Sequence, residues 1–206
     1  NGPARASSPT KLALSYDSAT GLGYGIAAAK GITGGRRAYK GALLEGGIGV
    51  PFIVRWPGKV PAGKVDNEAI LSAVDLLPTF CELAEVKLPK GYKPDGVSQV
   101  NVLMGKGRAL REKPLFWKIG APWPARPSKP DHWVSYAVVK NQWKLVVNAK
   151  GDYSELYDLV ADPYEKTDLK AKNAKVVKEL SMLLAEWKAS LPAKPKGKVF
   201  SKLRKE

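Results

Sequence analysis

Residues 37–58 read RAYKGALLEGGIGVPFIVRWPG. Near the centre of this stretch, Pro51 to Val54 form a short apolar, β-branched run bounded by proline and glycine, which predicts a buried strand that leaves a tight glycine turn. Lys40 precedes that turn, a position from which an ammonium can meet an anion at a sheet edge. On spacing alone, the simpler interpretation is that Lys40 is one solvated cation among many.

The order of residues in the stretch changes this weighing. From Lys40 onward the pattern is Lys-x-x-x-x-Glu-Gly-Gly-x-x-Val-Pro-x-Ile-x-Arg-Trp-Pro-Gly. It resembles a segment late in the catalytic domain of the formylglycine-dependent sulfatases, which have an alkaline-phosphatase-like fold, and the match is long and contiguous. The resemblance implies that Lys40 contacts the sulfate group of the substrate. The family usually has arginine where this chain has Gly49, so any role of that arginine is missing here.

A second segment resembles the same family. Residues 155–165 read ELYDLVADPYE, with Leu169 after them, and they are similar to the signature that closes the sulfatase C-terminal subdomain. Trp143-Lys144-Leu145 fits the same pattern, as do the VDLLPT run at 74–79 and the DGVS run at 95–98. The resemblance therefore covers roughly residues 37–191, in the order of the family.

The resemblance and the patterning together predict an α/β protein. We expect residues 1–110 to be the carboxyl-terminal part of an alkaline-phosphatase-like catalytic domain. Residues 111–206 are expected to form a small α+β subdomain, an antiparallel sheet with a C-terminal helix, followed by a basic tail. The segments at 74–79 and 95–98 are expected to be scaffold rather than chemistry.

The second half carries the clearest secondary-structure signals. Strands are predicted at 115–119, 135–140, 143–147 and 154–159, and Asn141-Gln142 between the middle two is typical of a two-residue hairpin turn, because asparagine tolerates positive φ. Apolar residues then recur at helical spacing from 176 to 191, which predicts an amphipathic helix. Asn173 is the expected N-cap of that helix, and an antiparallel meander with one covering helix makes a small α+β unit.

One helix is predicted in the first half. Ser72 with Asp75 three residues later has the form of a capping box, and Pro78 suits the first turn of a helix that should run to about Glu85. The single cysteine, Cys81, lies in this pattern and is expected to be a buried packing residue. A lone cysteine excludes an internal disulfide and a zinc site built on several thiolates.

Composition restricts the function classes. The chain has 206 residues, 44% of them hydrophobic, which is enough for a packed core. No apolar run is long enough to span a bilayer, and no signal peptide opens the chain. The net charge of +15 is spread along the sequence rather than gathered in one patch, whereas a nucleic-acid reader should concentrate it. A basic solvated surface is the simpler explanation, to which attraction of a sulfated substrate can be added.

Sulfate-ester hydrolysis needs a nucleophile, a divalent metal and cations that hold the sulfate oxygens. In the family the nucleophile is a hydrated formylglycine made from a Cys- or Ser-x-Pro-x-Arg motif, and this chain contains no such motif. The resemblance implies calcium as the metal, with its aspartate ligands and the formylglycine in an amino-terminal part that is missing here. Asn1, which begins an Asn-Gly dipeptide, is a candidate calcium ligand by the same resemblance, although a plain turn is the simpler interpretation.

His132 is the only histidine. It follows a proline-rich loop, residues 122–130, that contains Trp123 and Arg126. A half-exposed loop histidine is the simpler interpretation, and the alternative is that this loop reaches the cleft, where His132 would help to bind the substrate.

Two function classes follow. The first is the carboxyl-terminal portion of a sulfatase that hydrolyses aryl sulfates or sulfated carbohydrates, inactive by itself and completed by its amino-terminal part. The second is a non-catalytic basic module that binds an anionic polymer. We expect a sulfated small molecule or sulfated glycan as the partner, neither nucleic acid nor membrane, and a periplasmic or secreted location by resemblance.

Overall fold

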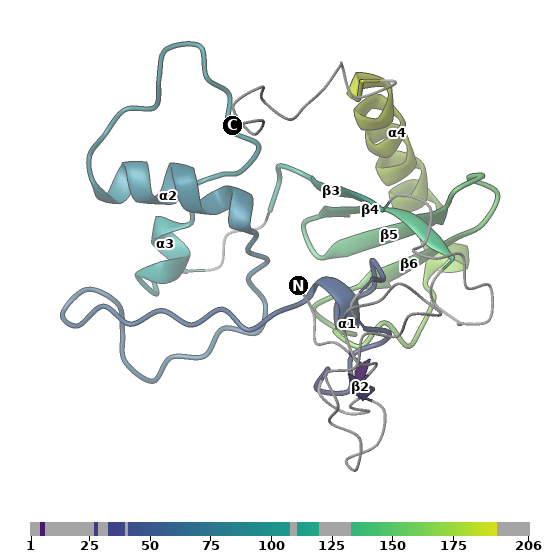
Figure 1. The fold of residues 1–206 in the computed structure, drawn as a ribbon, viewed down its shortest axis with the longest axis horizontal. Coiled ribbons are helices and arrows are strands. Elements are labelled where there is room, and N and C mark those ends of the chain that lie inside the picture. The colour runs from purple at the N-terminus through teal and green to yellow at the C-terminus, as the bar shows by residue number, and fades with distance from the viewer. Residues whose placement is uncertain are drawn as a thin grey trace, which may run out of the picture.

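A computed structural model describes residues 33–39, 41–107, 111–119 and 133–192, together with the backbone of two paired two-residue strands, Arg5–Ala6 (β1) and Ala27–Ala28 (β2). Figure 1 shows a four-stranded sheet with a long helix on one side of the molecule, and extended segments with short helices on the other. No helix in these described ranges is long and apolar enough to cross a membrane. The proline-rich loop at 122–130 and residues 193–206, where the basic tail is expected, lie outside them.

The sheet is the antiparallel meander that the sequence predicts. Its strands pair in chain order, β3-β4-β5-β6, and their bounds are Leu115–Lys118, Val134–Lys140, Trp143–Asn148 and Ser154–Asp158. The β4–β5 turn is the predicted two-residue hairpin, and Asn141 there has φ +52°, the left-handed conformation that asparagine accepts. The predicted antiparallel sheet is therefore confirmed.

One face of the sheet is covered by α4, Ala174–Ser190. Leu180 and Leu184 of the helix are buried against the middle of the sheet, and the ring of Trp187 stacks on that of Phe116 with centroids 5.0 Å apart. The predicted C-terminal helix is confirmed. Asn173 occupies the N-cap position, but its side-chain amide donates to the carbonyl of Leu169 at 3.0 Å instead of capping the helix.

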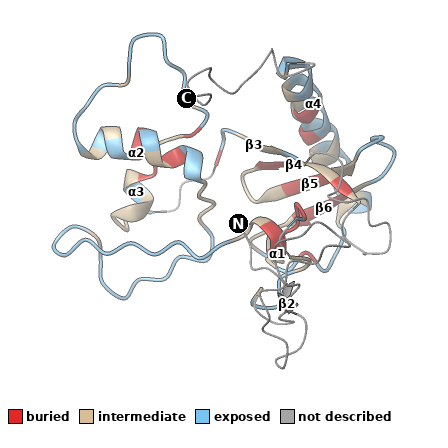
Figure 2. Ribbon diagram, viewed as in Figure 1, coloured by how far each residue is buried: buried red, intermediate tan, exposed pale blue. Residues whose placement is uncertain are grey.

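The opposite face is covered by the segment that contains Lys40. Leu43 and Leu44 are buried against Val134, Ala137 and Val146 and the ring of Tyr157, and the next residues form the short helix α1, Glu45–Ile48. The sheet therefore lies between α4 and the sulfatase-like segment, and Figure 2 shows the buried residues gathered there. Alternation along the strands explains this arrangement, since successive residues of a strand face opposite sides.

A second, smaller centre of burial lies around α2, Leu76–Leu83, which follows a 3₁₀ turn at Ala73–Asp75. The predicted capping box is present, with the Ser72 backbone N–H donating to Asp75 at 2.8 Å. The carboxylate of Asp75 also accepts from the N–H of Val97 and forms a two-pronged ion pair with Arg111, at 2.6 and 2.8 Å. The carbonyl of Arg111 accepts from the N–H of Asn141, so Arg111 links α2 to the β4–β5 hairpin.

Two sequence predictions for the first half are wrong. Pro51 to Val54 form no strand and are exposed, with 88% of Ile53 accessible. A strand is stable only when a neighbour satisfies its backbone groups, and no described segment pairs with this one. Cys81 is half-buried rather than buried, because the helix that carries it exposes the neighbouring face at Leu77 and Phe80. That helix ends at Leu83, close to the expected end.

Replacing Arg111 with methionine leaves the buried Asp75 carboxylate without its cation. We expect the free energy of unfolding to fall by about 3 kcal/mol, since breaking one side of a buried ion pair leaves an uncompensated charge. Urea denaturation of the chain measures the change. Lys140→Met is the matched control, because Lys140 pairs with the exposed Glu179, and a pair of this kind contributes less than about 1 kcal/mol. Equal losses in the two variants would contradict the structural role of Arg111.

Candidate functional site

The three residues that the sequence singles out for chemistry, Lys40, His132 and Asn1, lie outside the described residues. The structure does describe the residues on both sides of Lys40. Residues 37–45, called the Lys40 loop below, run from Arg37 to the first residue of α1, and their described members show how the loop is held.

The Lys40 loop folds back tightly on itself. The N–H of Gly46 donates to the carbonyl of Arg37 at 2.7 Å, and the N–H of Ala42 donates to the carbonyl of Tyr39 at 3.1 Å. The second of these bonds spans position 40. Together they fix the backbone on either side of that position.

The two glycines of the Glu-Gly-Gly motif make this close approach possible. A Cβ at Gly46 would lie 2.2 Å from the carbonyl oxygen of Ala38, and a Cβ at Gly47 would lie 2.2 Å from that of Ala42. Both distances are far below van der Waals contact with backbone atoms that cannot move independently. The start of α1 therefore packs backbone against backbone on the Lys40 loop, which explains why this motif contains two glycines in succession.

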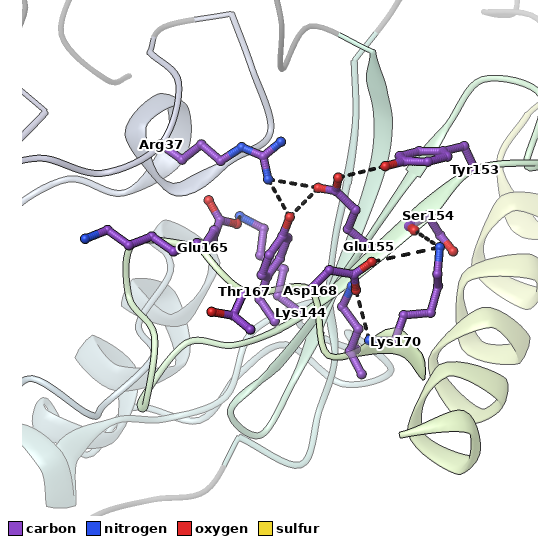
Figure 3. Close-up of polar contacts among 12 residues, drawn as sticks. Arg37, Lys144, Tyr153, Ser154, Glu155, Glu165, Thr167, Asp168 and Lys170 are labelled. Atoms are coloured by element: carbon purple, nitrogen blue, oxygen red, sulfur yellow. Dashed lines mark hydrogen bonds and ion pairs between the residues drawn. The ribbon is translucent and has the colours of Figure 1, made fainter. Parts of the chain in front are cut away.

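At its far end the loop is attached by a group of three charged residues, called the Lys144 cluster, of which Lys144 and Glu165 are buried and Glu45 is half-buried. The ammonium of Lys144, on β5, lies 2.8 Å from a carboxylate oxygen of Glu45 and 2.8 Å from one of Glu165. The N–H of Glu45 also donates to Glu165 at 2.6 Å. The side chains of Lys144 and Glu165 are completely buried, and Figure 3 shows them on the loop-facing side of the sheet.

Opposing effects act on the pKa of Glu165 in the Lys144 cluster. Burial raises the pKa of Glu165 above its ordinary value, while the adjacent Lys144 and the N–H of Glu45 oppose that rise. Lys144 is the cation that opposes the effect of burial on Glu165, so the lysine favours the charged form of that carboxylate. Glu165 also has φ +54°, an uncommon conformation for a residue with a side chain, which its contacts with Lys144 and Glu45 help to hold.

At its near end the loop is attached by a second group, called the Glu155 cluster. Arg37 donates to the carboxylate of Glu155 at 2.9 Å and to the hydroxyl of Tyr157 at 2.5 Å, both on β6. The hydroxyl of Tyr157 donates to Glu155 in turn, and burial raises the pKa of Tyr157, so it stays a neutral donor. Tyr153 donates to the other carboxylate oxygen at 3.0 Å, a hydrogen bond that raises the pKa of Tyr153 (Figure 3).

The same cluster reaches the neighbourhood of His132. Trp133, the next residue in the chain, packs edge-to-face on Tyr153 with ring centroids 4.7 Å apart. The contacts therefore run from Trp133 through Tyr153 and Glu155 to Arg37, three residues before Lys40. The structure thus connects the chain beside Lys40 with the chain beside His132, and it does not describe the two residues themselves.

The sequence did not predict the roles of Lys144, Glu155 and Glu165, which entered only as positions that match the family pattern. A signal was present for Lys144, because it shares its strand face with Val146 of the core, and a lysine at such a position requires a partner. The strained conformation of Glu165 and its pairing with Glu45, 120 residues earlier, carry no signal in a single sequence.

No group of three or more His, Cys, Asp or Glu side chains in the described ranges is arranged to hold a metal ion. The carboxylates of the Lys144 cluster already bind the ammonium, and the carboxylate of the Glu155 cluster binds the guanidinium. The described residues therefore do not fit the calcium site that the resemblance implies, and no step is assigned to calcium through them.

Comparison with known proteins identifies the family. Residues 38–190 match the family model described as N-sulphoglucosamine sulphohydrolase, C-terminal. The chain is 31% identical over 162 residues to the N-acetylgalactosamine-6-O-sulfatase of Bacteroides thetaiotaomicron, a match that covers 72% of this chain and 29% of that protein.

Two solved structures are similar to this chain in fold and in sequence. One comes from a study of the metabolism of multiple glycosaminoglycans by Bacteroides thetaiotaomicron, with 30% identity and a TM-score of 0.58 over 77% of this chain and 33% of that one. The other is Ps i-CgsB in complex with k-i-k-neocarrahexaose, with 27% identity and a TM-score of 0.60 over 73% and 31%.

The chain thus spans about a third of the length of the relatives it matches. Its antiparallel sheet and C-terminal helix match the predicted α/β class with an α+β end, which confirms the predicted fold. The family model, the relative and the solved structures agree, and the chain belongs to the sulfatase family, of which it is a C-terminal portion.

Proposed function

We propose that this chain is the carboxyl-terminal part of an enzyme that hydrolyses sulfate esters, and that Lys40 binds the sulfate. The observation that carries the proposal is the attachment of the Lys40 loop at both ends to one sheet, through Arg37 to Glu155 and through Glu45 to Lys144. A loop held in this way can present a side chain at a fixed position, which binding of a transferring group requires.

The chemistry assigned to Lys40 is electrostatic. Its ammonium is a compact charge that can hold a sulfate oxygen and stabilise negative charge that develops on the leaving group. The formylglycine nucleophile belongs to an amino-terminal part, as does the calcium, which would polarise the sulfate when bound. Asn1 as a calcium ligand and a division of the chain near residue 110 stay predictions.

We propose a sulfated carbohydrate rather than an aryl sulfate as the substrate. The name of the Bacteroides relative, N-acetylgalactosamine-6-O-sulfatase, supports this choice, as does the bound oligosaccharide of Ps i-CgsB. The contacts of Trp133 and Tyr153 beside the Glu155 cluster support the idea that the loop before Trp133, with His132, borders the same cleft. Such substrates are met outside the cytoplasm, so we propose a periplasmic or secreted location.

The exposed apolar segment after α1 supports the need for an amino-terminal partner part. Val50, Phe52, Ile53 and Trp56 expose 54%, 49%, 88% and 41% of their surface, and Figure 2 shows exposure along the whole of this segment. Large contiguous apolar exposure marks an interaction surface. We propose that the remainder of the catalytic domain covers this segment and supplies the strand neighbours that it lacks.

Replacing Lys40 with alanine in the protein that includes its amino-terminal part should lower kcat/KM by about 100- to 1000-fold, the usual cost of removing a group that stabilises transition-state charge. Sulfate release from a 6-O-sulfated N-acetylgalactosamine substrate measures the effect. Lys59→Ala is the control, since Lys59 is exposed and lies just beyond the motif. A Lys40→Ala enzyme with the rate of the Lys59→Ala enzyme would end the assignment.

Replacing Ile53 with arginine should affect the stability of this chain and that of the longer protein differently. In the present chain the side chain is exposed, so we expect the free energy of unfolding to change by less than about 0.5 kcal/mol. In the longer protein an arginine would be buried without a partner, and soluble yield and melting temperature should fall. Met182→Arg, on the exposed side of α4, should be tolerated in both. Equal tolerance of Ile53→Arg in both proteins would contradict the proposed contact.

A further inference from the structure

We propose that Lys144 is a positioning residue for catalysis: through Glu45 it fixes the backbone of the Lys40 loop. This inference rests on the proposed function, because it assigns Lys144 an effect on the same reaction. Lys144 itself touches neither the substrate nor the reacting atoms.

The first step of the argument is that Glu45 is held in two directions. Its carboxylate binds the ammonium of Lys144 at 2.8 Å, and its N–H donates to Glu165 at 2.6 Å. Lys144 lies in a paired central strand, whose backbone is held on both sides by β4 and β6. The position of Glu45 is therefore set by the most rigid part of the fold.

The second step is that Glu45 cannot shift without the loop. The adjacent Gly46 donates to the carbonyl of Arg37 and has no room even for a methyl group against Ala38. Because these are backbone contacts, side-chain rotation cannot absorb a displacement. A shift of Glu45 therefore moves the residues on both sides of position 40.

The third step is that stability alone gives a weak reason for this cluster. A buried ion pair is often no more stabilising than apolar residues of the same volume, and the cluster holds two carboxylates for one ammonium. A fixed geometry is the advantage that an apolar replacement would lose. A loop misplaced by about 1 Å is enough to lower a rate by about 100-fold.

Lys144→Met tests the proposal because methionine keeps the length of the side chain and removes its charge. Glu165 then loses its ion pair while its side chain stays buried next to Glu45. The other charged or titratable groups near them are Arg36, which lies 3.4 Å from Glu45, and Arg37 with Glu155 and Tyr157 of the neighbouring cluster. The ion pair described for Glu165 is with Lys144, and those of Arg36 and Arg37 are with Glu45 and Glu155.

The pH dependence of the variant has a definite sign. Without the ammonium, burial and the neighbouring Glu45 carboxylate raise the pKa of Glu165 further, so Glu165 keeps its proton at low pH and can donate it to Glu45. As pH rises through the raised pKa of Glu165, its carboxylate becomes charged and the two side chains separate. We therefore expect kcat of Lys144→Met to fall about 10- to 100-fold below wild type near pH 8, with KM changed less, and to recover toward wild type as pH falls.

The double variant Lys144→Met/Glu165→Gln supplies the rescue. Glutamine can still accept the N–H of Glu45 and can donate to its carboxylate, so the repulsion is gone. We expect this variant to regain about tenfold of the lost kcat and to lose the added pH dependence. Arg111→Met is the control for stability, because it breaks a buried pair at α2, and it should leave kcat and its pH profile unchanged while the protein is folded.

Hydrogen exchange of this chain tests the positioning role of Lys144 independently of the role assigned to Lys40. In Lys144→Met we expect the amides of Ala42 and Gly46 to exchange about tenfold faster than in wild type, with the amides of α4 unchanged. Unchanged exchange at Ala42 and Gly46, or a wild-type kcat and pH profile for Lys144→Met, would overturn the positioning role. Faster exchange, together with an unchanged rate for Lys40→Ala, would support the positioning of the loop by Lys144 and reject only the role of Lys40.

Discussion

The ammonium of Lys144 binds two carboxylates from distant parts of the sequence. Glu45 precedes the four strands of the sheet, and Glu165 follows them. These contacts join the sulfatase-like segment to the last strands of the sheet. Leu43 and Leu44 pack on the same face of the sheet through non-directional apolar contacts. The ion pairs of Lys144 and the hydrogen bonds of Arg37 add directional contacts at the two ends of the loop.

The two faces of the sheet are covered through different kinds of contact. The α4 face is closed by leucine, phenylalanine and tryptophan side chains, which are tolerant of small adjustments. The opposite face combines apolar contacts with two clusters of directional polar contacts, around Lys144 and around Glu155. Polar contacts of this kind require defined distances and angles, so the face that carries the Lys40 loop is the one whose geometry is more narrowly specified.

The sequence allowed the second half of the fold to be predicted because its signals are local. Asn141-Gln142 marks its hairpin, and the apolar period marks α4, without reference to any distant residue. Pro51 to Val54 were wrongly predicted as a strand, because β-branched composition indicates what a segment is suited to pair with but not whether a neighbour is present. The family motif pointed to Lys40. The apolar strand face of Lys144 indicated that this lysine needs a partner but not which one, because its partners are 99 residues before it and in a loop after the next strand.

The hairpin turn between β4 and β5 has a consequence for engineering. Short exposed turns are usually the first choice for inserting an epitope or a fluorescent module. Here the N–H of Asn141 is bound to the carbonyl of Arg111, whose side chain holds Asp75. An insertion at this turn would therefore be transmitted to α2. The exposed residues Lys150 to Asp152, where Gly151 and Asp152 hydrogen bond to the nearby Asn148, are the better place to attach a reporter.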